Sequence, residues 1–176
     1  GHEVIVEADA GKNANFDTKD YSEAGAQIVY SPEDVFKAQM ILKVAPPSFD
    51  EVKMMPGNQT LLSALQLTVQ PVDSLKMLMA KKISAVAWDY FKDDTGIYPV
   101  VRAMGEIAGN TSVLVAAEYL SNVNNGQGSM FGGISGVKPT EVVVLGAGTV
   151  GEFAARAALG LGASVKVFDN QIYKLR

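Results

Sequence analysis

The 176-residue chain contains no cysteine and only one histidine, His2. It therefore has no disulfide or thiolate chemistry, and a single histidine cannot build a histidine-based metal cage. Lysine and arginine number 15 against 19 acidic residues, a formal charge of −4. The basic residues form no stripe, which argues against nucleic acid as a partner. The absence of cysteine fits a reducing cytoplasm, and we expect a cytoplasmic protein.

Long apolar runs are missing as well. No segment approaches the ~20 consecutive apolar residues of a membrane-spanning helix, and we expect neither a membrane span nor a signal peptide. The composition is nevertheless 48% hydrophobic and 19% charged, which is enough apolar material for a sizeable core. The length predicts one full domain or two smaller parts.

Strand and helix patterns alternate through the first half of the chain. This alternation predicts an α/β fold with a parallel sheet and helices on both faces. A long amphipathic pattern then predicts a helix over residues 100–121 that bridges two domains. Five glycines in residues 122–139 indicate an ordered connector with tight turns. The expected strands are 2–7, 26–30, 39–44 and 83–88, and the expected helices are 17–24, one from Ser31-Pro32, 48–55 and 71–82, with an apolar run at 61–67.

The most informative stretch is residues 142–170. Four apolar residues, 142–145, lead into Gly146, Ala147, Gly148, Thr149, Val150 and Gly151, then into an alanine-rich helical pattern and a strand at 164–168 that ends on Asp169. A GxGxxG string alone is a weak signal, but this order of strand, turn, helix, strand and acid is typical of a dinucleotide site. The alternative is a glycine-rich turn in another α/β domain that binds no nucleotide.

Each residue of this motif has an expected task. Gly146 permits the sharp turn, Gly148 lets the backbone approach a pyrophosphate, and Gly151 lets helix and strand pack closely. The phosphates meet the free N–H groups at the start of the helix near Thr149. Asp169 accepts hydrogen bonds from the adenosine ribose and repels a 2′-phosphate, so we predict NAD rather than NADP.

Two side chains in the first half are candidates for chemistry. Lys43 lies near the carboxyl end of an apolar strand, where parallel sheets bind ligands, and a small carboxylate or keto acid would partner its charge. The alternative is an ion pair with a local carboxylate. Gln66 lies in the apolar run, where a buried amide needs hydrogen bonds. It either faces a ligand or is a structural amide satisfied by the backbone.

Several segments together resemble the family of alanine dehydrogenase and the NAD-binding alpha component of nicotinamide nucleotide transhydrogenase. The likeness covers essentially the whole chain. Its specific parts are GHEVIVE (1–7), DYSEAGAQIV (20–29), LKV (42–44), RAMGEIAGN (102–110) and GQGSMFGGISGVKPTEVVVLGAGTVG (126–151). The resemblance implies NAD-dependent interconversion of L-alanine with pyruvate and ammonia by a two-domain subunit that assembles into oligomers, often hexamers.

The resemblance also implies roles for individual residues. Lys43 matches the family's substrate-binding lysine, and Met104 matches a position near the nicotinamide. Residues 146–151 and Asp169 match the cofactor loop and the ribose acid. The family's carboxylate-binding arginine precedes Gly1 and its catalytic aspartate follows residue 176, so we expect a fragment.

Two positions depart from the family pattern. Gln66 stands where many alanine dehydrogenases carry a proton-transferring histidine, and a glutamine cannot shuttle a proton near neutral pH. Gly105 replaces the serine that usually follows Met104, which removes a hydroxyl contact to the cofactor. Because transhydrogenase components also lack the histidine, that function is the alternative, together with a truncated module without activity.

The expected organisation has three parts. Residues 1–121 form an N-terminal substrate and catalytic domain of Rossmann-like α/β type, 122–139 form the connector, and 140–176 form the first βαβ of a Rossmann NAD-binding domain. We expect the strand ending at Leu145 to have an unpaired edge and the helix from Thr149 to have little to pack on. The chain alone should then lack dehydrogenase activity and bind NAD weakly.

Overall fold

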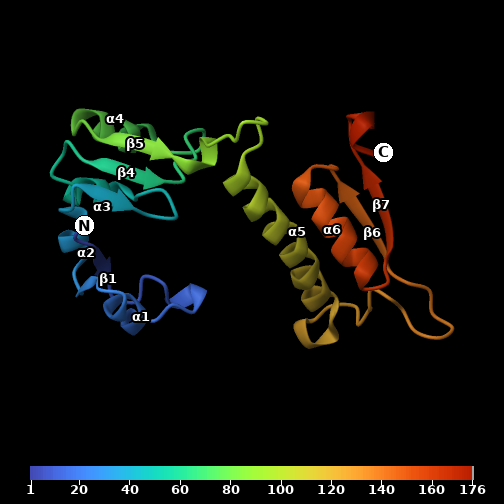
Figure 1. Cartoon of the computed structure of the whole chain (residues 1–176). Coiled ribbons are helices and arrows are strands. Elements are labelled where there is room, and N and C mark those ends of the chain that lie inside the picture. The colour runs from blue at the N-terminus through green and yellow to red at the C-terminus, as the bar shows by residue number, and fades with distance from the viewer. Residues whose placement is uncertain (176) are drawn as a thin grey trace. The chain divides into compact units, whose positions relative to one another are not determined.

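The computed structural model describes residues 1–175. The chain forms two compact units, which divide between Phe91 and Lys92. Figure 1 shows the elements of each unit. None of the helices in residues 1–175 is long and apolar enough to cross a membrane.

The first unit alternates short parallel strands with helices, which confirms the predicted α/β class. Its elements are β1 (Ile5–Glu7), η1 (Lys12–Ala14), α1 (Thr18–Glu23), β2 (Gln27–Val29), α2 (Pro32–Phe36), β3 (Met40–Leu42), α3 (Phe49–Met54), β4 (Thr60–Ser63), α4 (Val72–Ala80), β5 (Ser84–Ala87) and η2 (Trp88–Tyr90). Strands β1 to β5 and helices α1 to α4 each lie where the sequence predicts an element or an apolar run, within a few residues at the ends, whereas the short helices η1 and η2 were not predicted. Helix starts follow the sequence signals, since Pro32 opens α2 and Ser48 caps α3.

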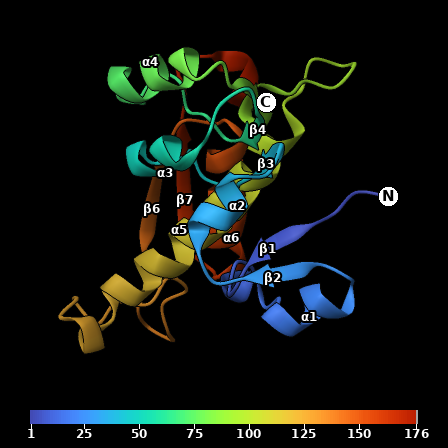
Figure 2. The same ribbon diagram turned by 90° about the vertical axis from the view of Figure 1, so that its left-hand side faces the viewer.

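The strands of this unit belong to two sheets, so the prediction of one continuous sheet is wrong for the described residues. Strands β1 and β2 pair with each other, and β3, β4 and β5 form a separate sheet in that order. Helix α2 contacts both β1 and β2 and also touches α3. Figure 2 shows the two sheets as separate ribbons.

Helices cover one face of the three-stranded sheet, and the expectation of helices on both faces is also corrected. Helices α3 and α4 pack against each other, while Met40 and Leu42 on β3 point to the exposed face. The strand order β3-β4-β5 runs in one direction, so successive right-handed crossovers place both helices on the same side. The core on that side contains Phe36, Ile41, Val52, Met55, Leu61, Leu65 and Leu78.

The second unit contains one long helix and a βαβ unit. Its elements are α5 (Pro99–Leu120), η3 (Asn122–Asn124), β6 (Glu141–Leu145), α6 (Thr149–Gly160), β7 (Ser164–Phe168) and η4 (Ile172–Leu175). Strands β6 and β7 are parallel and in register from Glu141 opposite Ser164 to Leu145 opposite Phe168. Among the residues described, β6 has no second neighbour, so its expected unpaired edge is confirmed. The connector is ordered, because Phe131 is buried in the core of this unit.

Helix α6 packs closely on α5, so the expectation that it has little to pack on is wrong. A Cβ atom at Gly109 of α5 would lie 2.5 Å from the Val150 carbonyl oxygen and 2.8 Å from Phe153 Cβ. Only glycine lets the two helices approach this closely. The core between them contains Val113, Phe131, Ala154, Ala158 and Ala163. By these contacts α5 belongs to the second compact unit. The predicted domain boundary after residue 121 stays a prediction.

Candidate functional site

The glycine turn of the second unit has the backbone that its sequence predicts. Gly146 directly follows β6 and has φ +105°, a conformation that favours glycine. A Cβ at Gly151 would overlap the carbonyl oxygen of Gly146, so this glycine permits the contact between helix and strand. A Cβ at Gly148, the N-cap of α6, would meet no described atom within 4 Å. The space beside Gly148 and the start of α6 is therefore open to a ligand.

Asp169 lies against this turn. Its Oδ2 accepts a hydrogen bond of 2.7 Å from the Ala147 N–H, and its Oδ1 accepts one of 2.7 Å from the Gln171 N–H. These bonds, that of Ala147 first, lower the pKa of the Asp169 carboxyl below its ordinary value. The group is thus ionised at neutral pH, and each oxygen keeps a lone pair for a further donor. A hollow of about 360 Å³ lined by Gly146, Phe168, Asp169 and Asn170 adjoins the carboxylate.

A larger cavity of about 1160 Å³ runs between α5 and β6, and the glycine turn lines part of it. Gly105 of α5 also lines this cavity, and a Cβ there would lie 3.4 Å from Thr149 Cγ2. Met104 is the preceding residue and is 57% exposed. The structure therefore brings the helical turn that carries Met104 beside the start of α6.

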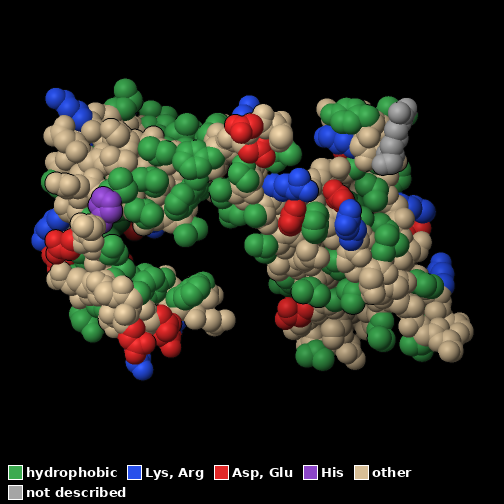
Figure 3. All heavy atoms as spheres, viewed as in Figure 1, with side chains coloured by type: hydrophobic (Ala, Val, Ile, Leu, Met, Phe, Trp, Pro, Cys, Tyr) green, Lys and Arg blue, Asp and Glu red, His purple; other side chains and the backbone are tan. Residues whose placement is uncertain are grey.

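These features fit a dinucleotide. The turn offers an open helix N-terminus for phosphates, and the carboxylate at the end of β7 has the position and charge that a ribose diol requires. The residues that could hold a dinucleotide here are Gly146, Ala147, Gly148, Thr149, Val150, Gly151 and Asp169. Figure 3 shows Lys and Arg side chains dispersed over the visible face, without a basic stripe.

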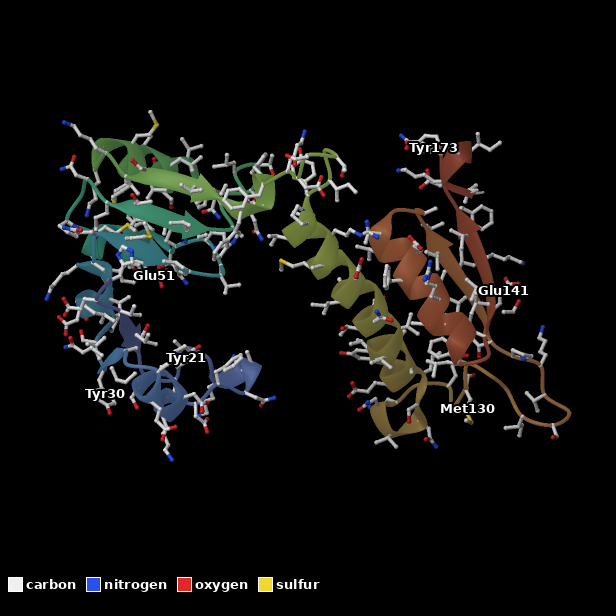
Figure 4. All side chains as sticks on the ribbon, viewed as in Figure 1. Tyr21, Tyr30, Glu51, Met130, Glu141 and Tyr173 are labelled. Carbon is white, nitrogen blue, oxygen red and sulfur yellow. The ribbon has the colours of Figure 1, made fainter. Side chains whose placement is uncertain are left out.

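Lys43 follows β3 at the carboxyl edge of the three-stranded sheet. Its N–H donates to the Leu62 carbonyl, which continues the parallel pairing by one residue. Its Nζ lies 3.4 Å from Glu51 Oε1, and the two side chains are 28% and 26% exposed. Glu51, labelled in Figure 4, also accepts the Ser48 N–H through Oε2 at 2.6 Å. The structure thus contains the local ion pair that the sequence left as an alternative, and a role in substrate binding stays a prediction.

Gln66 is exposed, so the expectation of a buried amide is wrong. Strand β4 ends at Ser63 and Leu65 takes the next core position, which leaves Gln66 in the turn beyond it. Gln66 has φ +46°, and its N–H donates to Asp89 Oδ2 at 2.9 Å. Gln66 and Lys43 follow neighbouring strands and lie at the same edge of one sheet.

Sequence reasoning missed two acids at this edge, Glu51 and Asp89. Both carry recognisable signals. The spacing of Ser48 and Glu51 is that of a capping box, which the structure contains. Asp89 directly follows the expected strand 83–88, at the sheet end where parallel sheets bind ligands.

The fold and the turn define the class of protein: an α/β protein with a Rossmann-type strand, glycine turn and helix. Comparison with known families makes the class specific. The family described as "Alanine dehydrogenase/PNT, N-terminal domain" matches residues 1–108, and "Alanine dehydrogenase/PNT, C-terminal domain" matches residues 112–176. The chain therefore belongs to the alanine dehydrogenase/PNT family.

Individual relatives agree with this assignment. Alanine dehydrogenase of Mycolicibacterium smegmatis is 40% identical over 177 residues, which cover 100% of this chain and 47% of the relative. That of Methanococcus maripaludis is 37% identical over 99% of the chain and 47% of the relative. The chain thus spans about half the length of the curated relatives it matches.

Two solved structures have similar folds. A structure named L-alanine dehydrogenase matches with a TM-score of 0.90 and 38% identity, covering 99% of this chain and 48% of that one. A transhydrogenase from Sinorhizobium meliloti matches with a TM-score of 0.80 and 24% identity, covering 99% and 52%. The second likeness concerns the fold alone.

Proposed function

We propose that this chain is part of an NAD-dependent alanine dehydrogenase, which interconverts L-alanine with pyruvate and ammonia. The observation that carries the proposal is the glycine turn with the Asp169 carboxylate bonded to its Ala147 N–H. Membership of the alanine dehydrogenase/PNT family supports it. By the same family likeness we propose a cytoplasmic homo-oligomer, with a hexamer as the expected form.

The second unit binds the cofactor in this proposal. The open N-terminus of α6 receives the pyrophosphate, and the Asp169 carboxylate accepts from the ribose hydroxyls. NAD, when bound, supplies the nicotinamide ring that accepts the hydride. Met104, beside the start of α6, packs near this ring.

The first unit binds the substrate. Lys43 Nζ has three donors, so it can keep Glu51 and still donate to the substrate's carbonyl or carboxylate oxygen. The charge on that substrate oxygen changes during hydride transfer, and the positive charge of Lys43 stabilises it. Gln66 orients the substrate by hydrogen bonding, and the proton passes to another group, with Lys43, a water molecule or the family's aspartate as candidates.

One observation favours a second function. By the family resemblance, Gln66 stands where many alanine dehydrogenases carry a histidine, and the alpha component of proton-translocating transhydrogenase also lacks this histidine. A third candidate is a module without activity.

The test is an assay of the full-length protein with L-alanine and NAD, in which NADH formation is followed by its absorbance. We expect alanine-dependent NADH formation and a much weaker rate with NADP. Hydride exchange between two nicotinamide nucleotides without alanine oxidation would instead support the transhydrogenase function, and neither reaction would support an inactive module.

Substitution of Lys43 tests whether this residue binds the substrate. Lys43→Met keeps the length of the stem and removes the charge, so turnover should collapse while NAD still binds. Lys76→Met is the matched control, because Lys76 pairs with Asp73 on the exposed surface of α4. Near-normal alanine oxidation by Lys43→Met would show that Lys43 is structural.

A further inference from the structure

Asp89 joins the carboxyl ends of two neighbouring strands. Its Oδ1 accepts the Leu65 N–H at 3.0 Å, and its Oδ2 accepts the Gln66 N–H at 2.9 Å. Asp89 lies on η2, directly after β5, and β5 pairs with β4 up to Ala87 opposite Ser63. One carboxylate therefore holds two consecutive backbone donors of the turn that follows β4.

This turn needs such an anchor because Gln66 adopts a left-handed conformation, with φ +46°. A residue with a Cβ atom is strained in this conformation and keeps it only where its surroundings enforce it. Leu65 is 6% exposed and belongs to the core, which fixes the chain on one side of Gln66. The Gln66 carbonyl accepts the Val69 N–H at 2.9 Å, which fixes it on the other side.

The two bonds to Asp89 are charge-assisted, which makes them stronger than bonds between neutral groups. Burial raises the pKa of the Asp89 carboxyl, but the N–H donors of Leu65, Gln66 and Asp89 itself together lower it below its ordinary value. The carboxylate is therefore ionised throughout the neutral range and keeps its full strength as an acceptor.

We infer that Asp89 is a positioning residue for Gln66: it holds the backbone turn that presents the Gln66 amide to the substrate at the carboxyl edge of the sheet. Asp89 acts through Gln66 and touches no reacting atom itself. The inference rests on the proposed function, in which Gln66 orients L-alanine or pyruvate.

The experiment is a double-mutant cycle in the full-length protein with the variants Asp89→Asn, Gln66→Ala and their combination. Asparagine keeps the shape of the side chain, but its amide nitrogen cannot accept one of the two N–H groups. We expect Asp89→Asn to lower kcat/KM for L-alanine by about tenfold, in line with the loss of one charge-assisted hydrogen bond. The KM for NAD should not change.

The Gln66→Ala variant distinguishes a positioning role of Asp89 from a purely structural one. In Gln66→Ala the amide is already absent, so adding Asp89→Asn should lower kcat/KM no further. A purely structural role for Asp89 would lower kcat/KM by the same factor in both backgrounds, and that result would overturn the inference. An unchanged kcat/KM in Asp89→Asn, with an active wild type, would overturn it as well.

Two controls separate positioning from stability. Gln66→Gly relieves the left-handed strain, so Asp89→Asn combined with Gln66→Gly should recover thermal stability but not kcat/KM.

Asp93→Asn removes a comparable carboxylate, one that accepts the Thr95 and Ile97 N–H groups in a different turn. It should leave kcat/KM for L-alanine unchanged, and an effect equal to that of Asp89→Asn would overturn the assignment to Gln66.

Hydrogen exchange keeps this test separate from that of the proposed function. If the wild type does not oxidise alanine, the proposed function fails, and exchange of the Leu65 and Gln66 amides then tests the anchor alone. Asp89→Asn should accelerate exchange at these two amides. Unchanged rates at both would overturn the anchor.

Discussion

The glycine turn of the second unit and the sheet edge of the first unit offer different kinds of groups to a ligand. The turn offers backbone groups and open space, since a Cβ at Gly148 would meet no described atom within 4 Å. The sheet edge offers side chains that already have partners, because Lys43 pairs with Glu51 and the backbone of Gln66 is tied to Asp89. The binding capacity of the glycine turn depends on the positions that have no Cβ atom. The binding capacity of the sheet edge depends instead on the residues that pair with and orient its side chains.

The largest expected effect comes from Gly151→Ala. The added methyl group would overlap the Gly146 carbonyl oxygen, and backbone on both sides cannot move away cheaply. We expect a loss of about 3 kcal/mol in the free energy of unfolding, together with loss of NAD binding. Thermal unfolding and calorimetric titration of the full-length protein measure the two quantities.

Gly148→Ala is the matched control within the same turn. Its methyl group enters open space, so stability should change by less than about 1 kcal/mol while NAD binding is lost, because the pyrophosphate must approach this atom closely. Equal destabilisation by Gly148→Ala and Gly151→Ala would show that Gly148 serves folding rather than binding. The two glycines would then not differ in the space beside them.

The next effect concerns cofactor choice at the end of β7. Asp169→Ala removes the carboxylate that, in the proposed function, accepts from the ribose and repels a 2′-phosphate, so NAD affinity should fall by about tenfold to a hundredfold and the preference for NAD over NADP should become smaller. Asp169→Asn separates the two contributions, since it keeps an acceptor but no charge. The ratio of kcat/KM for the two cofactors is the measurement, and an unaltered ratio in both variants would remove Asp169 from the site.

A smaller effect is expected at the sheet edge from Glu51→Gln. The glutamine oxygen still accepts the Ser48 N–H, so the start of α3 is kept while the charge beside Lys43 is lost. Freed from this competitor, Lys43 should bind the substrate carboxylate more tightly, and KM for L-alanine should fall by about two- to fivefold. Glu51→Ala loses the cap as well and should cost about 1 kcal/mol of stability. A KM that does not respond to Glu51→Gln would place the ion pair away from the substrate.

The smallest effect is a shared acid sensitivity. The pKa values of Asp89 and Asp169 are both lowered in the folded chain, so their bonds contribute stability above the ordinary aspartate value of about 3.9 and lose it as the pH falls through the lower folded value. The unfolding temperature should therefore not respond to these groups at neutral pH and should decline below about pH 4. Asp89→Asn and Asp169→Asn should each flatten that decline, and an unchanged acid profile in both variants would contradict it.

Local signals predicted the elements of this fold well. The cap at Ser48, the proline at the start of α2 and the glycine at the end of β6 each act within a few residues, so the sequence alone identifies them. The glycine turn was predictable for the same reason. Its conformation depends on the missing Cβ atoms of a short segment.

Contacts between distant segments were not predictable in this way. The separation of β1 and β2 from the other strands depends on pairing across the unit, which no local pattern encodes. The contact of Gly109 with Val150 joins residues 41 positions apart in the numbering, so the glycine had no visible partner in the sequence. The bond between Asp89 and Gln66 was not predictable either, because Asp89 lies 23 positions further along the chain, on η2 after β5.

The close crossing at Gly109 also has a mechanical meaning. Because α5 and α6 approach there through the backbone of α5 and the backbone and Cβ atoms of α6, little flexible material separates them, and we expect the two helices to move together. Met104 lies five residues before Gly109 on the same helix, so it is carried with the glycine turn at the head of α6. In the proposed function, Met104 near the nicotinamide and the turn that receives the phosphates would therefore keep a fixed relative position, and a bulkier residue at position 109 should disturb both at once.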